Sequence, residues 1–183
     1  MATRLNRRIT AADLDGLPHE WDTVYELLGG VLHMSRRPSV RHQRVLSRLF
    51  LRLGPAVADR GGEVLIEPGV VWEDEGDDNV APDLAVFRAP PPDDEKLRVC
   101  PDIVVEVLSP GEENRQRDLE AKRDLYFRRG AAEYWVIDPD GRSVLRLVRE
   151  AARWSEQRLS GEDVLLTPLV PEWPGLRVSE LFR

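Results

Sequence analysis

Residues 101–108, Pro-Asp-Ile-Val-Val-Glu-Val-Leu, are the most informative part of the chain for its architecture. An apolar run without polar alternation predicts a strand covered on both faces, in the middle of a sheet. The run nevertheless contains a carboxylate, Glu106. A second carboxylate, Asp83, lies 23 residues earlier within another apolar run, residues 80–87. Because burial of an unpaired carboxylate costs several kcal/mol, the two acids predict a shared cation and metal-dependent chemistry.

The sequence around this strand predicts a mixed α/β architecture. A polar helix over residues 113–129 ends at Gly130, and residues 132–138 predict the next strand, so that strand, helix and strand form a parallel crossover unit. Turn signals such as Gly29-Gly30 predict hairpins. Other strands are expected at 23–28, 31–35, 63–67, 70–73, 143–149, 154–159 and 164–166, helices at 10–16, 38–58 and 178–182, and an acidic loop at 74–79. We expect a central mixed β-sheet flanked by helices.

The composition fits one soluble globular domain over residues 1–183. Hydrophobic residues make up 42% and charged residues 32%, which argues against a disordered or membrane protein. No apolar stretch approaches the roughly 18 residues that cross a bilayer. Cys100 is the only cysteine, so neither a disulfide framework nor a thiolate metal site is expected. The first residues lack the apolar segment of a signal peptide, and a cytoplasmic protein is expected.

The net charge of −7 argues against a general nucleic-acid binder, but the charge is unevenly distributed. Residues 61–110 contain 13 acids and three bases. Residues 36–60 contain one acid and seven arginines, which are Arg36, Arg37, Arg41, Arg44, Arg48, Arg52 and Arg60. The basic helix over residues 36–52 is therefore a candidate surface for DNA phosphates, with a solvated arginine face as the alternative.

The helix over residues 113–129 adds Asp118, Lys122 and Tyr126, which are spaced four residues apart on one face. Lys122 is one of only two lysines among 26 basic residues. Lysine is a compact charge whose pKa can shift, a role that arginine does not fill. Mg²⁺ held by two carboxylates beside a lysine suits phosphodiester hydrolysis: the metal activates water, and the lysine orients that water or stabilises the phosphorus centre.

These residues, in this order, resemble the Uma family of restriction endonucleases. The resemblance rests on Pro82-Asp83, Glu106 in Val-Val-Glu-Val-Leu-Ser-Pro, the trio Asp118, Lys122 and Tyr126, and Glu133-Tyr134-Trp135-Val136-Ile137-Asp138-Pro139. It extends from about Tyr25 to Phe182 and implies a restriction-endonuclease-like fold, whose signature is Pro-Asp, then Asp or Glu, any residue and Lys. Leu108 occupies the position of that lysine, and the resemblance implies that Lys122 supplies it from the helix.

A purely structural explanation is also open for each of Asp83, Glu106 and Lys122. Asp83 could be a strand-end acid, Glu106 could pair with a buried arginine, and Lys122 could be a solvated partner of Asp118, an interaction of about 0.3–0.5 kcal/mol.

Three further residues are accessory candidates, and Asp118 joins them. Glu26 and Glu67 end predicted strands and could be additional metal ligands, although surface acids are common in hairpins. His42 begins the basic helix and could face the site, contact a phosphate, or be exposed.

We therefore predict an endonuclease that depends on Mg²⁺ (or Mn²⁺) and hydrolyses DNA. Asp83 and Glu106 would bind the metal, and Lys122 would assist the attacking water. A homodimer is expected by analogy, because double-strand cleavage needs two active sites. Two other functions stay open at this point: a non-catalytic interaction module on the same fold, and a metal-dependent phosphoesterase acting on nucleotides.

Overall fold

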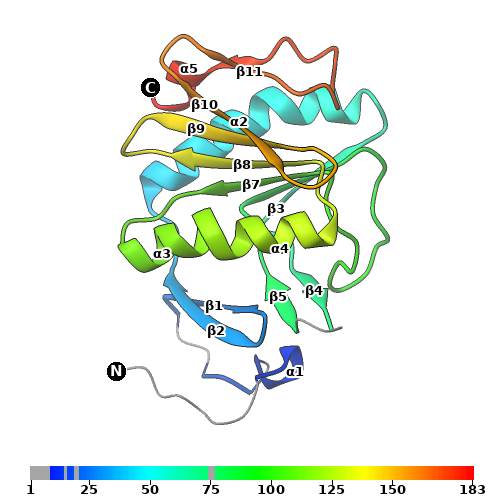
Figure 1. Cartoon of the computed structure of the whole chain (residues 1–183), viewed down its shortest axis with the longest axis vertical. Helices are drawn as coiled ribbons and strands as arrows, with labels where there is room; N and C mark the ends of the chain where they lie inside the picture. The colour runs from blue at the N-terminus through cyan, green and yellow to red at the C-terminus, as the bar shows by residue number, and fades with distance from the viewer. Residues whose placement is uncertain (1–8, 15, 19–20, 74–76) are drawn as a thin grey trace.

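A six-stranded mixed sheet organises the computed structural model, which describes residues 9–14, 16–18, 21–73 and 77–183 (Figure 1). The strand order is β10-β9-β8-β7-β6-β3. The bounds are Glu63–Ile66 (β3), Leu84–Phe87 (β6), Ile103–Val107 (β7), Glu133–Asp138 (β8), Ser143–Arg149 (β9) and Trp154–Ser160 (β10). Strands β7 and β8 are parallel, and the other neighbouring pairs are antiparallel. The predicted mixed sheet and its crossover unit are confirmed.

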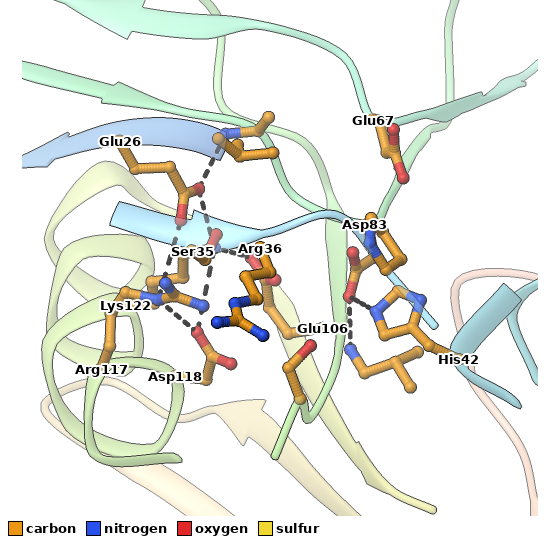
Figure 2. A pocket seen from close by; sticks show the side chains of 15 residues that line it. Glu26, Ser35, Arg36, His42, Glu67, Asp83, Glu106, Arg117, Asp118 and Lys122 are labelled. Atoms are coloured by element: carbon orange, nitrogen blue, oxygen red, sulfur yellow. Dashed lines mark hydrogen bonds and ion pairs between the residues drawn. The ribbon is translucent and has the colours of Figure 1, made fainter. Parts of the chain in front are cut away.

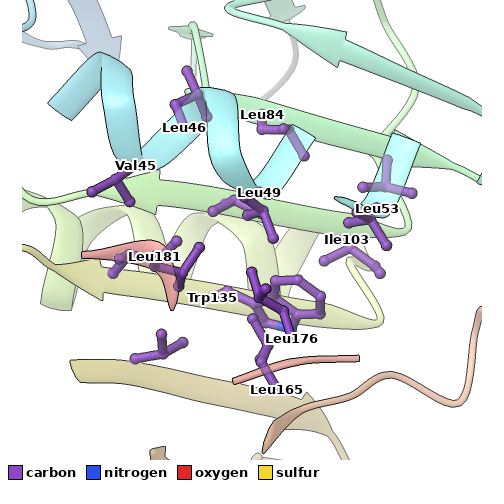
Figure 3. Packing of buried hydrophobic residues seen from close by; sticks show 14 of the residues in the cluster. Val45, Leu46, Leu49, Leu53, Leu84, Ile103, Trp135, Leu165, Leu176 and Leu181 are labelled. Atoms are coloured by element: carbon purple, nitrogen blue, oxygen red, sulfur yellow. The ribbon is translucent and has the colours of Figure 1, made fainter. Parts of the chain in front are cut away.

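Helix α2 (Val40–Ala58) covers one face of this sheet, because its apolar residues recur at helical spacing. Val45, Leu46, Leu49 and Leu53 are buried against strand residues such as Trp135 (Figure 3). The C-terminal segment completes this core. It contains β11 (Val164–Leu165), β12 (Leu176–Arg177) and α5 (Val178–Leu181). None of the helices in the described part of the chain is long and apolar enough to cross a membrane.

A continuous helical segment packs on the opposite face and connects β7 to β8 (Figure 1). Its three parts are α3 (Glu112–Gln116), a π-helical turn η1 (Arg117–Ala121) and α4 (Lys122–Arg129). The sequence predicted one regular helix here and did not predict the π turn. A π turn has one extra residue and is common at functional sites. The π turn therefore changes the directions of the side chains around Asp118 and Lys122, two of the candidate residues from the sequence.

A second sheet, of order β2-β1-β5-β4, lies next to this helical segment. Its strands are β1 (Thr23–Leu28), β2 (Val31–Arg36), β4 (Val70–Trp72) and β5 (Asp78–Val80), and a short helix α1 (Ala11–Leu14) precedes them. The expected loop at 74–79 is wrong for its last two residues, which begin β5, and residues 74–76 lie outside the described part. Asp78 is fully buried. Its carboxylate tolerates burial because it accepts hydrogen bonds from Gly29 N at 2.7 Å and Arg129 Nη2 at 2.8 Å.

Candidate active site

Asp83, directly before β6, lies opposite Glu106 on β7. Leu84 pairs with Val105 in antiparallel register, so the next pair along the two chains is Asp83 and Glu106. Residues opposite each other in such a pair point to the same face. A hydrogen bond of 2.6 Å from Val107 N to Asp83 Oδ2 closes this end of the ladder. Both carboxylates therefore face the α4 side of the sheet, and Asp83 lies directly before β6.

Lys122 lies beneath these acids, with only 1% of its surface exposed. Its Nζ is 2.8 Å from Glu106 Oε1, 2.9 Å from Glu26 Oε1 and 3.9 Å from Asp118 Oδ1. An ammonium group has three donors, and two of them are used by Glu106 and Glu26. The structure therefore excludes the solvated-lysine alternative and places Lys122 beside Glu106. Its third donor has no partner at hydrogen-bond distance among the described residues, and Lys122 lines the pocket described below.

The π turn places Arg117 on the same side as Lys122. The backbone N–H of Lys122 donates to the Arg117 carbonyl, and this five-residue hydrogen bond sets the two side chains one turn apart. Arg117 Nε donates to Asp118 Oδ1 at 2.9 Å and lies 3.7 Å from Glu26 Oε2. Glu26 is fixed in turn by the N–H of Ala81, at 3.0 Å. Two buried cations thus alternate with buried carboxylates.

His42 supports Asp83 from the first turn of α2. Its Nε2 is 3.0 Å from Asp83 Oδ2, and its Nδ1 is enclosed with no hydrogen-bond partner among the described residues. Ser39 accepts the backbone N–H of His42 at 3.2 Å and caps the helix, which fixes where the ring points. The imidazole therefore holds Asp83 in one orientation, as groups behind metal ligands commonly do.

All seven candidate residues from the sequence line one pocket of about 150 Å³. They are Glu26, His42, Glu67, Asp83, Glu106, Asp118 and Lys122. Figure 2 shows Asp83 and His42 on one side of it and Glu26, Asp118 and Lys122 on the other. Glu67 lies at the rim, exposed, and accepts a hydrogen bond from Gln43 at 3.2 Å. The pocket thus collects residues that are up to 96 positions apart in the chain.

The protonation of this cluster follows from burial and from its neighbours. Burial raises the pKa of Glu106 well above its ordinary value, and Asp83 and Asp118 add to this increase against the opposing effect of Lys122. Burial also opposes ionisation of Glu26, but Lys122 and Arg117 outweigh it and lower the Glu26 pKa. Burial lowers the pKa of Lys122, but the surrounding carboxylates outweigh it and raise that pKa. Lys122 therefore remains a cation and acts as a hydrogen-bond donor.

The pKa of His42 is likewise set by burial and by a neighbouring carboxylate. Burial lowers the pKa of His42, but the hydrogen bond and the charge of Asp83 outweigh it, so the pKa is raised. An imidazolium would strengthen the contact with Asp83.

The donor set fits a hard cation that keeps most of its water ligands. Hydrogen bonds and ion pairs engage Oδ2 of Asp83 and Oε1 of Glu106, and leave Oδ1 and Oε2 of these carboxylates without a partner among the described residues. In this part of the chain, no three or more His, Cys, Asp and Glu side chains converge into a complete cage. Mg²⁺ binds through one or two carboxylates plus water and phosphate, whereas Zn²⁺ and Ca²⁺ need more protein ligands.

The basic surface is smaller than the sequence suggested. Three of its arginines bind the protein itself: Arg41 pairs with Asp140 at 2.5 Å, Arg48 donates to Leu181 O at 3.0 Å, and Arg52 pairs with Glu180 at 3.1 Å. Arg36, Arg37 and Arg44 are exposed, and they have no ion pair with the described residues. The candidate phosphate-contacting surface therefore narrows to the start of α2 and the end of β2.

The sequence-based prediction missed one charged residue of the pocket. Arg117 was not singled out, because nothing in the sequence distinguishes it from the other arginines of the chain. Leu108, which stands where the superfamily pattern expects lysine, is 6% exposed and packs in the apolar core beside α4.

Comparisons with known proteins identify the family and support the fold. A family model described as Uma2, "Putative restriction endonuclease", matches residues 11–179. The fold is similar to a crystal structure from Anabaena variabilis ATCC 29413, described as "a putative nuclease belonging to DUF820", with a TM-score of 0.77. The sequences are 19% identical, and the match covers 95% of this chain and 97% of the other. None of the curated proteins matches the chain.

Proposed function

Because the chain belongs to the Uma2 restriction endonuclease family, we propose that it hydrolyses DNA phosphodiester bonds with Mg²⁺ (or Mn²⁺) as cofactor. The observation that carries this proposal is the opposed pair Asp83 and Glu106, each with one carboxylate oxygen unused, beside the buried Lys122. Family membership supports a nuclease, and the dependence on a metal and the choice of DNA are part of the proposal.

Asp83 and Glu106 would hold the metal through their unused oxygens. A bound Mg²⁺ would supply an activated water and neutralise the charge that develops on the phosphate. His42 and the N–H of Val107 fix Asp83, so that its free oxygen stays directed at the pocket. The two carboxylates thus provide charge and direction without a conformational change.

Lys122 would act as a donor to the attacking water or to a phosphate oxygen. Its raised pKa keeps it protonated, so proton abstraction is not its role. Glu26 and Glu106 hold the ammonium group at 2.9 and 2.8 Å, which positions its third donor. Preorganised donors of this kind stabilise developing charge at little reorganisation cost.

Plasmid nicking and linearisation with Mg²⁺ or Mn²⁺ test the proposal. We expect cleavage by the wild-type protein and none by Asp83→Ala or Glu106→Ala, with EDTA abolishing activity. Activity that persists in both variants would contradict the assignment. An RNA of the same sequence serves as the substrate control for the choice of DNA.

The biological setting belongs to the same proposal. A homodimer would supply the two active sites that double-strand cleavage needs, and analytical ultracentrifugation with and without DNA tests it. The lone Cys100 fits a reducing compartment such as the cytoplasm.

A further inference from the structure

Arg117 lines the pocket from the π turn, and the mechanism above gives it no role. Its side chain is 8% exposed. The Nε group is held by Asp118 at 2.9 Å, with Glu26 at 3.7 Å. Its two Nη groups form no hydrogen bond with the described residues. One edge of the guanidinium is thus fixed by carboxylates, while the Nη groups keep their donors unused by the described residues.

Arg36 lines the same pocket from the last position of β2. It is exposed and has no hydrogen bond or ion pair from its side chain to the described residues. In Figure 2 it lies between the Asp83–His42 pair and the cluster around Lys122. Arg36 and Arg117 therefore bring two guanidinium groups to one opening from two different elements.

A phosphodiester needs such groups here, because the pocket wall is acidic. Five carboxylates line it, from Glu26, Glu67, Asp83, Glu106 and Asp118. An approaching phosphate is repelled by them unless cations compensate. A guanidinium presents parallel N–H donors that match two phosphate oxygens, and it is strongest when it is already held in place. Arg117 meets this condition, since Asp118 fixes its Nε.

We propose that Arg117 and Arg36 form a phosphate-binding subsite of this pocket, in which Arg117 contacts the phosphodiester to be cut and Arg36 contacts a neighbouring phosphate of the same strand. The proposal rests on the proposed nuclease function and adds the residues that hold the substrate backbone. The Lys122 ammonium then acts on the same phosphate from below.

Binding without cleavage tests this subsite. The probe is a fluorescein-labelled 16-base-pair DNA duplex, titrated by anisotropy in Ca²⁺ and separately in EDTA. We expect Arg117→Gln to weaken binding about 10- to 100-fold, and Arg36→Gln about 3- to 10-fold. Each substitution should also reduce the magnitude of the slope of the logarithm of the association constant against the logarithm of the salt concentration by about one, because one phosphate contact is lost.

The matched control is Arg123→Gln. Arg123 lies on α4, pairs with Glu156 at 2.5 Å and does not line the pocket, so this variant should bind as the wild type does. Arg117→Lys keeps the charge and loses the paired donors; we expect it to recover only part of the affinity. If Arg117 merely neutralises Asp118, the double variant Arg117→Gln/Asp118→Asn should restore binding, and that result would overturn the proposal.

A substrate-side experiment keeps the test valid even where Arg117→Gln does not fold. Single methylphosphonates, which lack the phosphate charge, are placed along the duplex and titrated with the wild-type protein. We expect two neighbouring positions to weaken binding, and Arg117→Lys to reduce the penalty at one of them. Uniform small effects at every position would refute the subsite.

The outcomes separate the two proposals. Cleavage with unchanged affinity and salt slope in Arg117→Gln would reject the subsite and leave the nuclease intact. Binding that depends on Arg117, without cleavage in Mg²⁺ or Mn²⁺, would support the subsite and reject the nuclease. A wild-type protein that neither binds nor cleaves the duplex would overturn both.

Discussion

Two buried glutamates on neighbouring strands, Glu106 on β7 and Glu133 on β8, show how a candidate site residue differs from a member of a structural ion pair. Glu133 is 1% exposed and accepts four hydrogen bonds: Arg146 and Thr167 donate to Oε1, and Arg146 and Trp135 donate to Oε2. Its acceptor capacity is filled. Glu106 is 3% exposed but accepts only at Oε1, from Lys122 and Tyr126.

The two carboxylates differ in the number of oxygens that are left without a hydrogen-bond partner. Glu133 does not line the pocket that Glu106 faces, and its partners close around it. Glu106 faces a pocket beside Asp83, and its pKa is raised well above the ordinary value by burial and nearby acids. Burial of a carboxylate alone therefore indicates nothing about function; an unfilled oxygen beside a second acid does.

The largest expected effect is on cleavage. Glu106→Gln and Asp83→Asn keep side-chain size and remove the charge that would bind the metal, and activity should fall about 1,000-fold or more, equivalent to about 4 kcal/mol. Glu133→Gln, corrected for the folded fraction, should retain wild-type activity. Steady-state nicking of a supercoiled plasmid measures all three. Equal losses in Glu106→Gln and Glu133→Gln would remove the distinction between the two glutamates.

The free energy of unfolding should be affected in the reverse order, more by substitution of Glu133 than by substitution of Glu106. Glu133→Ala leaves the part-buried Arg146 without its ion-pair partner, which costs about 3 kcal/mol of unfolding free energy. Glu106→Gln should cost less, because Lys122 keeps its ion pair with Glu26 at 2.9 Å. Urea denaturation in EDTA gives both values. A larger loss in Glu106→Gln would mean that Glu106, too, is mainly structural.

Metal-linked stabilisation should be a smaller effect, and of the two glutamates it should depend on Glu106 alone. At a Mg²⁺ concentration ten times the dissociation constant, the wild-type protein should gain about 1.4 kcal/mol. Asp83→Asn and Glu106→Gln should lose this gain. Glu133→Gln should retain it, relative to its own metal-free baseline. Thermal denaturation with Mg²⁺ and with EDTA provides the comparison, and equal melting temperatures for the wild type would instead favour the non-catalytic interaction module.

Strand β7, which carries Glu106, was predictable from its apolar run. The run over residues 80–87 was predicted as one strand that contains Asp83, but only Leu84–Phe87 forms β6, and Asp83 lies directly before it. The opposition of Asp83 and Glu106 was not predictable, since it depends on the β6–β7 register between segments 23 residues apart. Lys122 was identified from its rarity and from the family resemblance, and its burial follows from tertiary packing.

Arg117 and Asp78 show where sequence patterns fail. Arg117 faces the pocket because of a π turn, a local change of helix geometry that no periodicity in the sequence announces. Asp78 lies in an acid-rich segment that predicts a solvated loop. It is instead buried in β5, because Arg129, 51 residues away, neutralises it. The position of Arg117 depends on local helix geometry, and the burial of Asp78 depends on a partner that is distant in sequence.

The smallest expected effect is a difference in pH dependence without metal. In EDTA, folded Glu106 holds its proton above the ordinary pKa of 4.5, whereas the unfolded chain releases it there. The folded state then binds more protons, so wild-type stability should fall as the pH rises from about 4.5 to the raised pKa of Glu106. Glu106→Gln lacks this proton and should lose that part of the slope.

Urea denaturation of the wild type and of Glu106→Gln across this pH range measures the difference between the two slopes. Lys122 stays protonated throughout, because its pKa is raised, so the difference reports on Glu106. Parallel curves would mean that Lys122 fully offsets the burial of Glu106. The carboxylate would then be as well satisfied as Glu133, and the unfilled Oε2 would carry no energetic signature of a cation site.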